Sequence, residues 1–195
     1  MSGGRPRGFD PEAVLDRALD VFWRQGYEGS SLADLTSAMG INRPSLYAAF
    51  GNKEQLFGRV LDRYLAGPGA FAAAALTSDR ARDVIERLLY GAVELTTGAS
   101  TPPGCLSVRS AQACGAEAEP ARQAAIARRA AGYAALRDRL ERARDDGDLP
   151  AGCDPAALAR LVSATTDGIA VQAAGGANRE DLLRAVETAL RCWPD

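Results

Sequence analysis

The sequence contains no histidine. That absence removes the commonest general base, the side chain that changes charge near neutral pH, and the most usual metal ligand. The chain also lacks a P-loop, a GxGxxG turn and a CxxC pair. Its carboxylates are scattered over charged segments and are not paired within apolar runs. We therefore expect a protein that is not an enzyme and that has no catalytic residue, cofactor or metal site.

Long apolar runs are also missing. No run of about 18 apolar residues marks a membrane span, and the opening MSGGRPRGFD lacks the apolar centre of a signal peptide. We expect a cytoplasmic protein without a membrane partner. The four cysteines, Cys105, Cys114, Cys153 and Cys192, are widely spaced, which fits a reducing compartment better than a disulfide framework.

Strand patterns are absent as well. No segment alternates apolar and polar residues, and alanine dominates where β-branched residues would be expected. Of the 195 residues, 47% are hydrophobic and 25% are charged, which is enough for one larger or two smaller packed units. The sequence therefore predicts an all-α fold.

The balance of charge excludes binding to nucleic acid through overall basicity, because the formal net charge is −2. Residues 1–65 contain eight Arg or Lys and eight acidic residues. Basic groups would have to gather on one face to hold a polyanion, and Arg5, Arg7, Arg43 and Lys53 are the candidates.

Residues 30–57, SSLADLTSAMGINRPSLYAAFGNKEQLF, contain two short helical patterns joined by a tight turn. Ser31 is placed to cap the first helix, and Gly40 is placed to end it in a left-handed conformation. Asn42 is placed to cap a second helix that begins at Arg43 and Pro44, where proline loses no hydrogen bond. This pattern predicts a helix-turn-helix.

The second helix of the pattern should run to about Phe50 and present two different faces. At about 100° per residue, Leu46, Ala49 and Phe50 share one face, whereas Pro44, Tyr47 and Ala48 lie away from it. A helix about 10 Å long fits a major groove ~12 Å wide. Arg43 would then pair with guanine or a phosphate and Tyr47 with a phosphate. Pro44 and Ala48 would touch a thymine methyl.

The segment GINRPSLYAAFGNKEQLF resembles the amino-terminal domain of the TetR-type (TetR/AcrR) transcriptional repressors. The resemblance rests on Gly40, Asn42, Leu46, Tyr47, Phe50 and Lys53. It implies base contacts from Arg43, Pro44, Ser45 and Ala48, and phosphate contacts from Ser31, Tyr47 and Lys53. With the capping Asn42, these residues form the predicted DNA-binding set. The implied partner is a double-stranded DNA operator.

We predict a flexible N-terminal arm at 1–9, a three-helix DNA-binding domain at 10–65, and a larger helical domain for effector binding and dimerisation at 66–195. Gly26 should end the first helix, and Asp79 should cap the helix at 80–97. The other helices are expected at about 54–65, 70–76, 105–115, 119–146, 155–174 and 179–192. Arg5 and Arg7 of the arm would reach a minor groove or phosphates, with a disordered tail as the open alternative.

The last two predicted helices, 155–174 and 179–192, carry more apolar residues than a small bundle needs. We expect that a homodimer uses this surface, with an intramolecular core as the alternative. The resemblance implies a four-helix bundle between two copies, which would place two recognition helices ~34 Å apart on a palindromic operator.

The resemblance also implies a small-molecule effector that moves the helices beneath the DNA-binding domains. We place it near Leu89, Tyr90, Val93, Leu106 and Tyr133, although apolar residues at helical spacing are more often core.

Two alternatives remain open. Cys105 and Cys114 allow a thiol-based sensor of oxidants, electrophiles or copper(I). On one helix their sulfurs would lie about 13 Å apart, too far for a disulfide, so buried inert cysteines are the stronger interpretation. The other alternative is a helical adaptor that binds a protein through Pro44, Tyr47 and Ala48.

Overall fold

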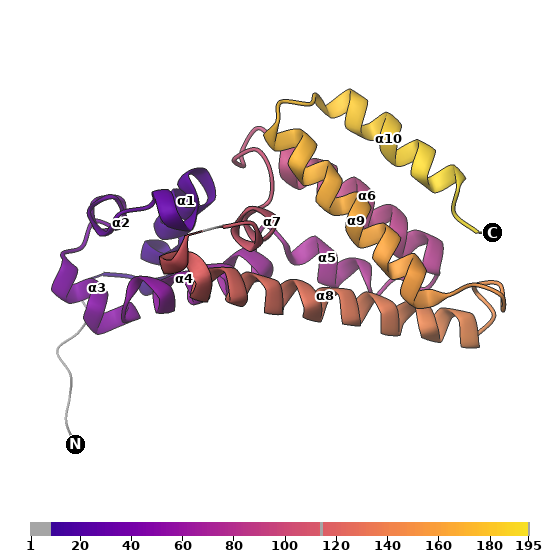
Figure 1. The fold of residues 1–195 in the computed structure, drawn as a ribbon, viewed down its shortest axis with the longest axis horizontal. Helices are drawn as coiled ribbons and strands as arrows, with labels where there is room; N and C mark the ends of the chain where they lie inside the picture. The colour runs from indigo at the N-terminus through magenta and orange to yellow at the C-terminus, as the bar shows by residue number, and fades with distance from the viewer. Residues whose placement is uncertain (1–8, 114, 195) are drawn as a thin grey trace, which may run out of the picture.

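The computed structural model describes residues 9–113 and 115–194, and within these residues the chain is all-helical. The elements are α1 (Pro11–Gly29), α2 (Leu32–Met39), α3 (Arg43–Phe50), α4 (Lys53–Ala66), α5 (Ala70–Ala75), α6 (Ala81–Thr97), α7 (Leu106–Ala111), the 3₁₀ turn η1 (Ala116–Ala118), α8 (Glu119–Asp145), α9 (Pro155–Ala174) and α10 (Arg179–Arg191). Helices α1–α4 gather at one end, and α8 runs from this group along the rest of the molecule (Figure 1). The predicted all-α fold is confirmed.

Two clusters of buried apolar side chains hold the chain together. The first joins α1–α4 with Leu106 of α7, with Ala118 of η1, and with Ala121 and Ala125 at the start of α8. The second joins α5, α6, α9 and α10 with the later part of α8. Helix α8 therefore belongs to both clusters, and the first cluster crosses the predicted domain boundary at residue 66.

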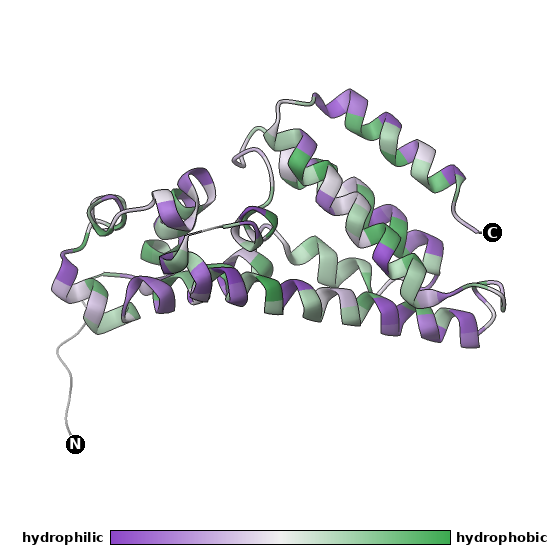
Figure 2. Ribbon diagram, viewed as in Figure 1, coloured by the Kyte–Doolittle hydropathy of each residue, from purple (hydrophilic) through white to green (hydrophobic). Residues whose placement is uncertain are grey.

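Helix α10 is strongly amphipathic, and hydrophilic bands recur along it (Figure 2). Its apolar residues Leu182, Val186 and Leu190 are buried within the second cluster. The apolar residues of α10 therefore fill the core of the same chain. Of the last two helices, only α9 exposes large apolar side chains, which are Leu161 and Val171.

Several helix boundaries differ from the sequence prediction. Gly26 leaves the helical conformation, with φ 75° and ψ 174°, but helical residues resume and α1 ends only at Gly29. Helix α7 ends at Ala111, short of the predicted end at 115, and a 3₁₀ turn follows. Cys105 precedes α7, and Cys114 lies outside the described residues. Cys105 is therefore not within a helix, and the sulfur separation expected from helical geometry does not apply.

The predicted cap of α6 is wrong. The helix begins at Ala81, after Arg80, so Asp79 stands one residue too early to cap it. Instead, the Ala81 N–H donates to Oδ2 of Asp148, which comes from the turn after α8. A carboxylate from a distant segment thus satisfies one of the first N–H groups of α6.

This exchange of caps gives a testable prediction. Asp148→Ala is expected to lower the free energy of unfolding by about 1 kcal/mol, because it removes the acceptor at the start of α6. Asp79→Ala is the matched control, with an expected change within about 0.5 kcal/mol. Chemical denaturation of both variants measures the difference. A larger loss in Asp79→Ala than in Asp148→Ala would contradict this assignment.

Candidate nucleic-acid interface

The turn between α2 and α3 is built from local hydrogen bonds that the sequence indicated. Ser31 caps α2, because its Oγ accepts from the Asp34 N–H at 3.0 Å. Gly40 ends the helix with φ 67°, a left-handed conformation that glycine adopts without strain. Asn42 Oδ1 then accepts from the Ser45 N–H at 2.9 Å and caps α3, in which Pro44 occupies the first turn. Caps and turn together fix the direction in which α3 leaves α2.

Helix α3 separates its residues into a buried face and an exposed face, as predicted. The buried residues are Leu46, Ala49 and Phe50. The exposed residues are Arg43, Pro44, Tyr47 and Ala48, and Ser45 is partly buried. Tyr47 keeps 48% of its surface exposed although it is a large aromatic residue. Among the residues that the structure describes, no hydrophobic core covers this face.

Two arginines that the sequence analysis did not single out hold the carboxyl ends of these helices. Arg17 of α1 donates from Nη1 to the Met39 carbonyl at the end of α2, at 3.2 Å. Arg59 of α4 donates from Nη1 to the Ala49 carbonyl at the end of α3, at 3.1 Å, and its guanidinium lies over the Phe50 ring. A cation favours the carboxyl end of a helix, but only the tertiary structure shows which cation reaches it.

The predicted phosphate contacts at the two flanks have different surroundings. Both donors of Ser31, its N–H and its Oγ–H, are directed to Oδ2 of Asp34. These bonds lower the pKa of Asp34, so a negative charge already stands where a phosphate would approach Ser31. The Nζ of Lys53 lies 4.4 Å from the centroid of the Tyr27 ring. Burial lowers the pKa of Lys53, and the charges of Glu117 and Glu28 act in the opposite direction.

The surface beside α3 is hollowed. A cavity of about 410 Å³ is lined by Phe9, Gly40, Ile41, Asn42, Ser45, Ala48 and Ala49. Three members of the predicted DNA-binding set, Asn42, Ser45 and Ala48, thus border one depression.

Phe9, which we assigned to the flexible arm, stacks on Phe50 with ring centroids 6.5 Å apart. The predicted contacts of Arg5 and Arg7 lie outside the described residues.

The residues predicted to bind an effector are not brought together. Leu89 and Val93 are buried in the second cluster, whereas Leu106 is buried in the first. Tyr90 is exposed, and Tyr133 donates to the Ala156 carbonyl while Arg160 covers its ring. Helical spacing identified apolar positions correctly but does not indicate which of two clusters each one joins.

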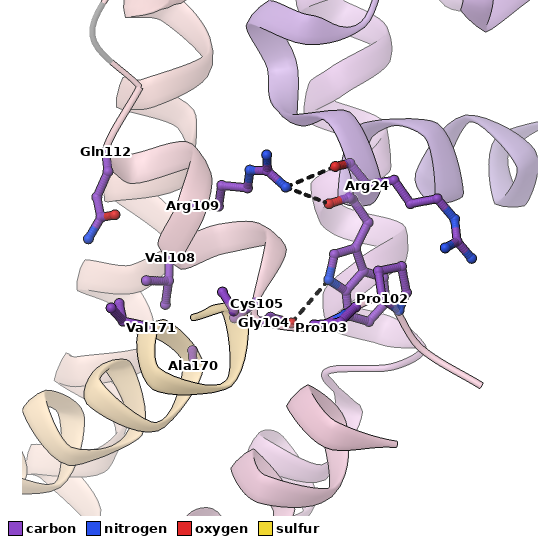
Figure 3. Close-up of a pocket in the computed structure, with 12 residues that line it drawn as sticks. Arg24, Pro102, Pro103, Gly104, Cys105, Val108, Arg109, Gln112, Ala170 and Val171 are labelled. Atoms are coloured by element: carbon purple, nitrogen blue, oxygen red, sulfur yellow. Dashed lines mark hydrogen bonds between the residues drawn. The ribbon is translucent and has the colours of Figure 1, made fainter. Parts of the chain in front are cut away.

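A larger cavity, of about 600 Å³, lies elsewhere, where α1 meets the later helices. Its lining residues come from α1, the loop before α7, α7 itself and α9: Trp23, Arg24, Pro102, Pro103, Gly104, Cys105, Val108, Arg109, Gln112, Ala170, Val171 and Ala174. Figure 3 shows Arg109 directed at two backbone carbonyls of α1 and the Trp23 indole bonded to the Gly104 carbonyl. We name this cavity the junction pocket.

Helix α3 is short, has proline in its first turn, follows a tight turn after α2, and packs one face on the core while the other face is exposed. This arrangement is that of a DNA-binding helix-turn-helix protein. Comparison with known proteins agrees. Residues 14–60 match the family described as bacterial regulatory proteins, tetR family, and residues 80–189 match the tetracyclin repressor-like C-terminal domain. The chain belongs to the TetR family of transcriptional regulators, a class of regulator and not of enzyme.

Individual relatives match along nearly the whole chain. The HTH-type transcriptional repressor ComR of Escherichia coli (strain K12) is 34% identical over 100% of this chain and 93% of its own length. A solved structure of the TetR family regulator CifR, a cysteine mutant in complex with 26 bp operator DNA, is 44% identical with a TM-score of 0.92 over 97% of this chain and 100% of CifR. A putative TetR regulator from Rhodococcus sp. RHA1 is 43% identical with a TM-score of 0.64, over 93% of this chain and 97% of its own.

Proposed function

We propose that this protein is a homodimeric repressor that binds a palindromic operator and is released from it by a small molecule. The observation that carries the proposal is the exposed face of α3, where Arg43, Pro44, Tyr47 and Ala48 stand clear of the chain's own core. These side chains are the types that read base edges and phosphates in a major groove. The solved complex of the relative CifR with operator DNA supports the same use of this fold.

The exposed side of α9 supports the homodimer. The residues Ala157, Leu161, Ala164, Gly168 and Val171 are all exposed, and they follow one another at intervals of four and three. We name these five residues the α9 stripe. Leu161 and Val171 expose 57% and 48% of their surfaces. Such spacing places residues along one seam of a helix, and small residues between larger ones allow two helices to approach closely.

The contribution of α10 to this interface would be polar, because its apolar side chains are already buried. The predicted interface through the last two helices therefore has an apolar centre on α9 and a polar margin on α10. Two copies related by a two-fold axis would present their α3 helices to the same side of a duplex, about 34 Å apart.

The contacts between α8 and the DNA-binding helices support control by an effector. Arg128 of α8 forms an ion pair with Asp62 of α4 at 2.7 Å and donates to the Gly58 carbonyl at 3.0 Å. Because α8 belongs to both clusters, a change in the second cluster would reach α4 through these bonds. A ligand releases the repressor only if it binds more tightly to the arrangement that does not fit the operator.

Selection from random duplexes, followed by gel-shift assays with the selected sequence and with the promoter beside the gene, tests this function. The expected result is a palindromic sequence bound by a dimer, with half-sites about 10 bp apart or a multiple of that distance. Enrichment of no sequence would instead favour the alternative of a helical adaptor that binds a protein through the face of Tyr47. Addition of candidate compounds to the complex then identifies those that release it.

The thiol alternative has a separate test at Cys105. Its Sγ lies 3.0 Å from the Tyr64 hydroxyl and 3.2 Å from the Ser107 hydroxyl. Burial raises the pKa of Tyr64, and Cys105 adds to the increase. Among the described residues, no group of three or more His, Cys, Asp or Glu is arranged to hold a metal ion.

Cys105→Ser is expected to leave operator binding and the response to oxidants unchanged, because a serine hydroxyl keeps both hydrogen bonds. The expected change in the free energy of unfolding is within about 1 kcal/mol. The measurement is operator binding before and after treatment with diamide or hydrogen peroxide, for the variant and the wild type together. An oxidant response present in the wild type and absent in Cys105→Ser would establish the thiol alternative.

Within the described ranges, no helix is both long and apolar enough to cross a lipid bilayer.

A further inference from the structure

The junction pocket lies between the DNA-binding helices and the rest of the molecule. Its walls come from the end of α1, the loop at 102–105, α7 and the end of α9 (Figure 3). A volume of about 600 Å³ falls within the roughly 300–1,000 Å³ that is usual for small-molecule sites. An occupant would touch α1 directly, without an intervening helix.

The lining of the pocket carries positive charge and no negative charge. Among the residues that line it, the side chains charged at neutral pH are those of Arg24 and Arg109. Arg24 is paired with Asp20, both of whose oxygens lie 2.9 Å from its Nε. Figure 3 shows the Arg24 guanidinium on the side away from Arg109. Among the described residues no carboxylate pairs with Arg109, which is therefore the cation that meets an occupant.

The remaining walls are mainly apolar. Pro102 and Pro103 lie on one side, and Val108, Ala170 and Val171 lie on the other (Figure 3). Trp23 also lines the pocket. The Trp23 Nε1–H is already donated to the Gly104 carbonyl at 3.1 Å, so the ring offers its surface and not its donor. One cation among apolar walls favours a ligand with an apolar body and a single anionic group.

Arg109 also has a structural task. Its Nη1 donates to the Arg24 carbonyl at 2.9 Å and to the Trp23 carbonyl at 3.5 Å. Both carbonyls stand just before Gly26, where the backbone of α1 leaves the helical conformation. Carbonyl groups at such a break lack partners within the helix, and Arg109 supplies one from α7.

We propose that the junction pocket binds a small carboxylic acid with an aliphatic or aromatic body, and that the acid is the effector of the proposed function, on which this inference rests. The carboxylate pairs with the Arg109 guanidinium. Because both partners are charged, this bond is stronger than the bonds of the same guanidinium to neutral carbonyls, and the ligand draws Arg109 away from α1. The end of α1 then loses its tie to α7, and the DNA-binding helices that pack on α1 lose their fixed position.

Trp23 provides the readout for binding. In a Trp193→Phe background, Trp23 is the remaining tryptophan, and its emission reports occupancy of the pocket. The full-length protein is titrated with octanoate and phenylacetate, and with octanamide and phenylacetamide as neutral counterparts of the same shape. The carboxylates are expected to give a saturable change, and the amides to bind about tenfold more weakly.

Substitutions of Arg109 separate charge from structure. Arg109→Gln is expected to weaken binding of the acids about tenfold and to remove their advantage over the amides. Arg109→Lys keeps a cation and should restore a clear preference for the acids. Arg87→Gln, at an exposed arginine of α6, is the matched control and should bind like the parent. Far-UV circular dichroism confirms that each variant is folded.

Operator binding is measured in the same samples. Equal binding of acids and amides, no binding of any of the four compounds, or unchanged acid binding in Arg109→Gln would each overturn the assignment of the pocket. If neutral compounds release the operator complex and the acids do not, the junction-pocket proposal fails while the repressor function stands. If the acids bind as expected but no operator is bound, the proposed function fails and the pocket is retained.

Discussion

Replacement of Gly168 by glutamate is expected to convert the proposed dimer into a monomer and to lower operator affinity by roughly 10²–10⁴-fold. Gly168 stands in the α9 stripe between Ala164 and Val171. In a two-fold interface the same residue comes from both copies, so the substitution would bury two carboxylates in it. Two unpaired charges of the same sign in an apolar interface cost several kcal/mol, on the order of what holds such helices together.

The loss of affinity follows from the loss of the second half-site. In a dimer, binding of one α3 helix holds the other close to its own half-site, which raises its effective concentration. A monomer retains only the contacts of a single α3 helix. The helix-turn-helix itself is unaffected, because α9 lies in the second cluster and α3 packs in the first.

The fold of the isolated chain tolerates this change. Apart from its chain neighbours and the nearby backbone of its own helix, a Cβ at Gly168 would meet no atom within 4 Å, and the same is true at Gly132 of α8. Gly132→Glu is therefore the matched control: it adds the same charge to an exposed helical glycine outside the α9 stripe. Light scattering after gel filtration measures the mass, and fluorescence anisotropy measures operator affinity. If Gly168→Glu remains a dimer and binds as the wild type does, the interface lies elsewhere.

The sequence predicts those parts of the site that depend on neighbouring residues. Ser31, Gly40, Asn42 and Pro44 act on backbone groups at most a few positions away, so their types and spacing determine the two helices and the turn. The exposed and buried faces of α3 follow from the helical period for the same reason. The structure confirms these features at the predicted positions.

Contacts between distant segments were not predictable in this way. Asp148 caps α6 from 67 positions away, and Arg109 reaches the α1 carbonyls from 85 and 86 positions away. Many arginines and aspartates in the sequence have the same local context, and only the packing of helices selects one of them. The junction pocket is likewise invisible to pattern analysis, because four separate segments form its walls.

Substitution of alanine at Arg43 or Tyr47 is expected to weaken operator binding by about 1–3 kcal/mol for each side chain that contacts a base directly. Arg43 begins α3, and Tyr47 lies one turn later on the same exposed side. Neither side chain is part of the buried support, so the helix content and the dimer should be unchanged. The measurement is operator affinity by anisotropy, with circular dichroism and light scattering as checks of structure.

The form of the loss identifies the contact that each residue makes. If Arg43 binds guanine, Arg43→Ala relaxes the preference at one position of the operator. If Arg43 binds a phosphate, affinity falls about equally for all sequences, and the dependence of log affinity on log salt is reduced by about one unit. Tyr47→Phe separates the hydroxyl from the ring, since a loss equal to that of Tyr47→Ala assigns the contact to the hydroxyl.

Arg87→Ala is the control for Arg43→Ala, because it removes an exposed arginine from α6 with the same change in net charge. Its operator affinity should stay close to that of the wild type at moderate salt, where charges more than about 10 Å from the DNA are screened. An equal loss in Arg43→Ala and Arg87→Ala would show that overall charge, and not α3, determines binding. Wild-type affinity in both Arg43→Ala and Tyr47→Ala would show that α3 does not contact the operator. The structure describes α2 and α3 in full, and no other exposed face of these two helices combines an arginine and a tyrosine within one turn.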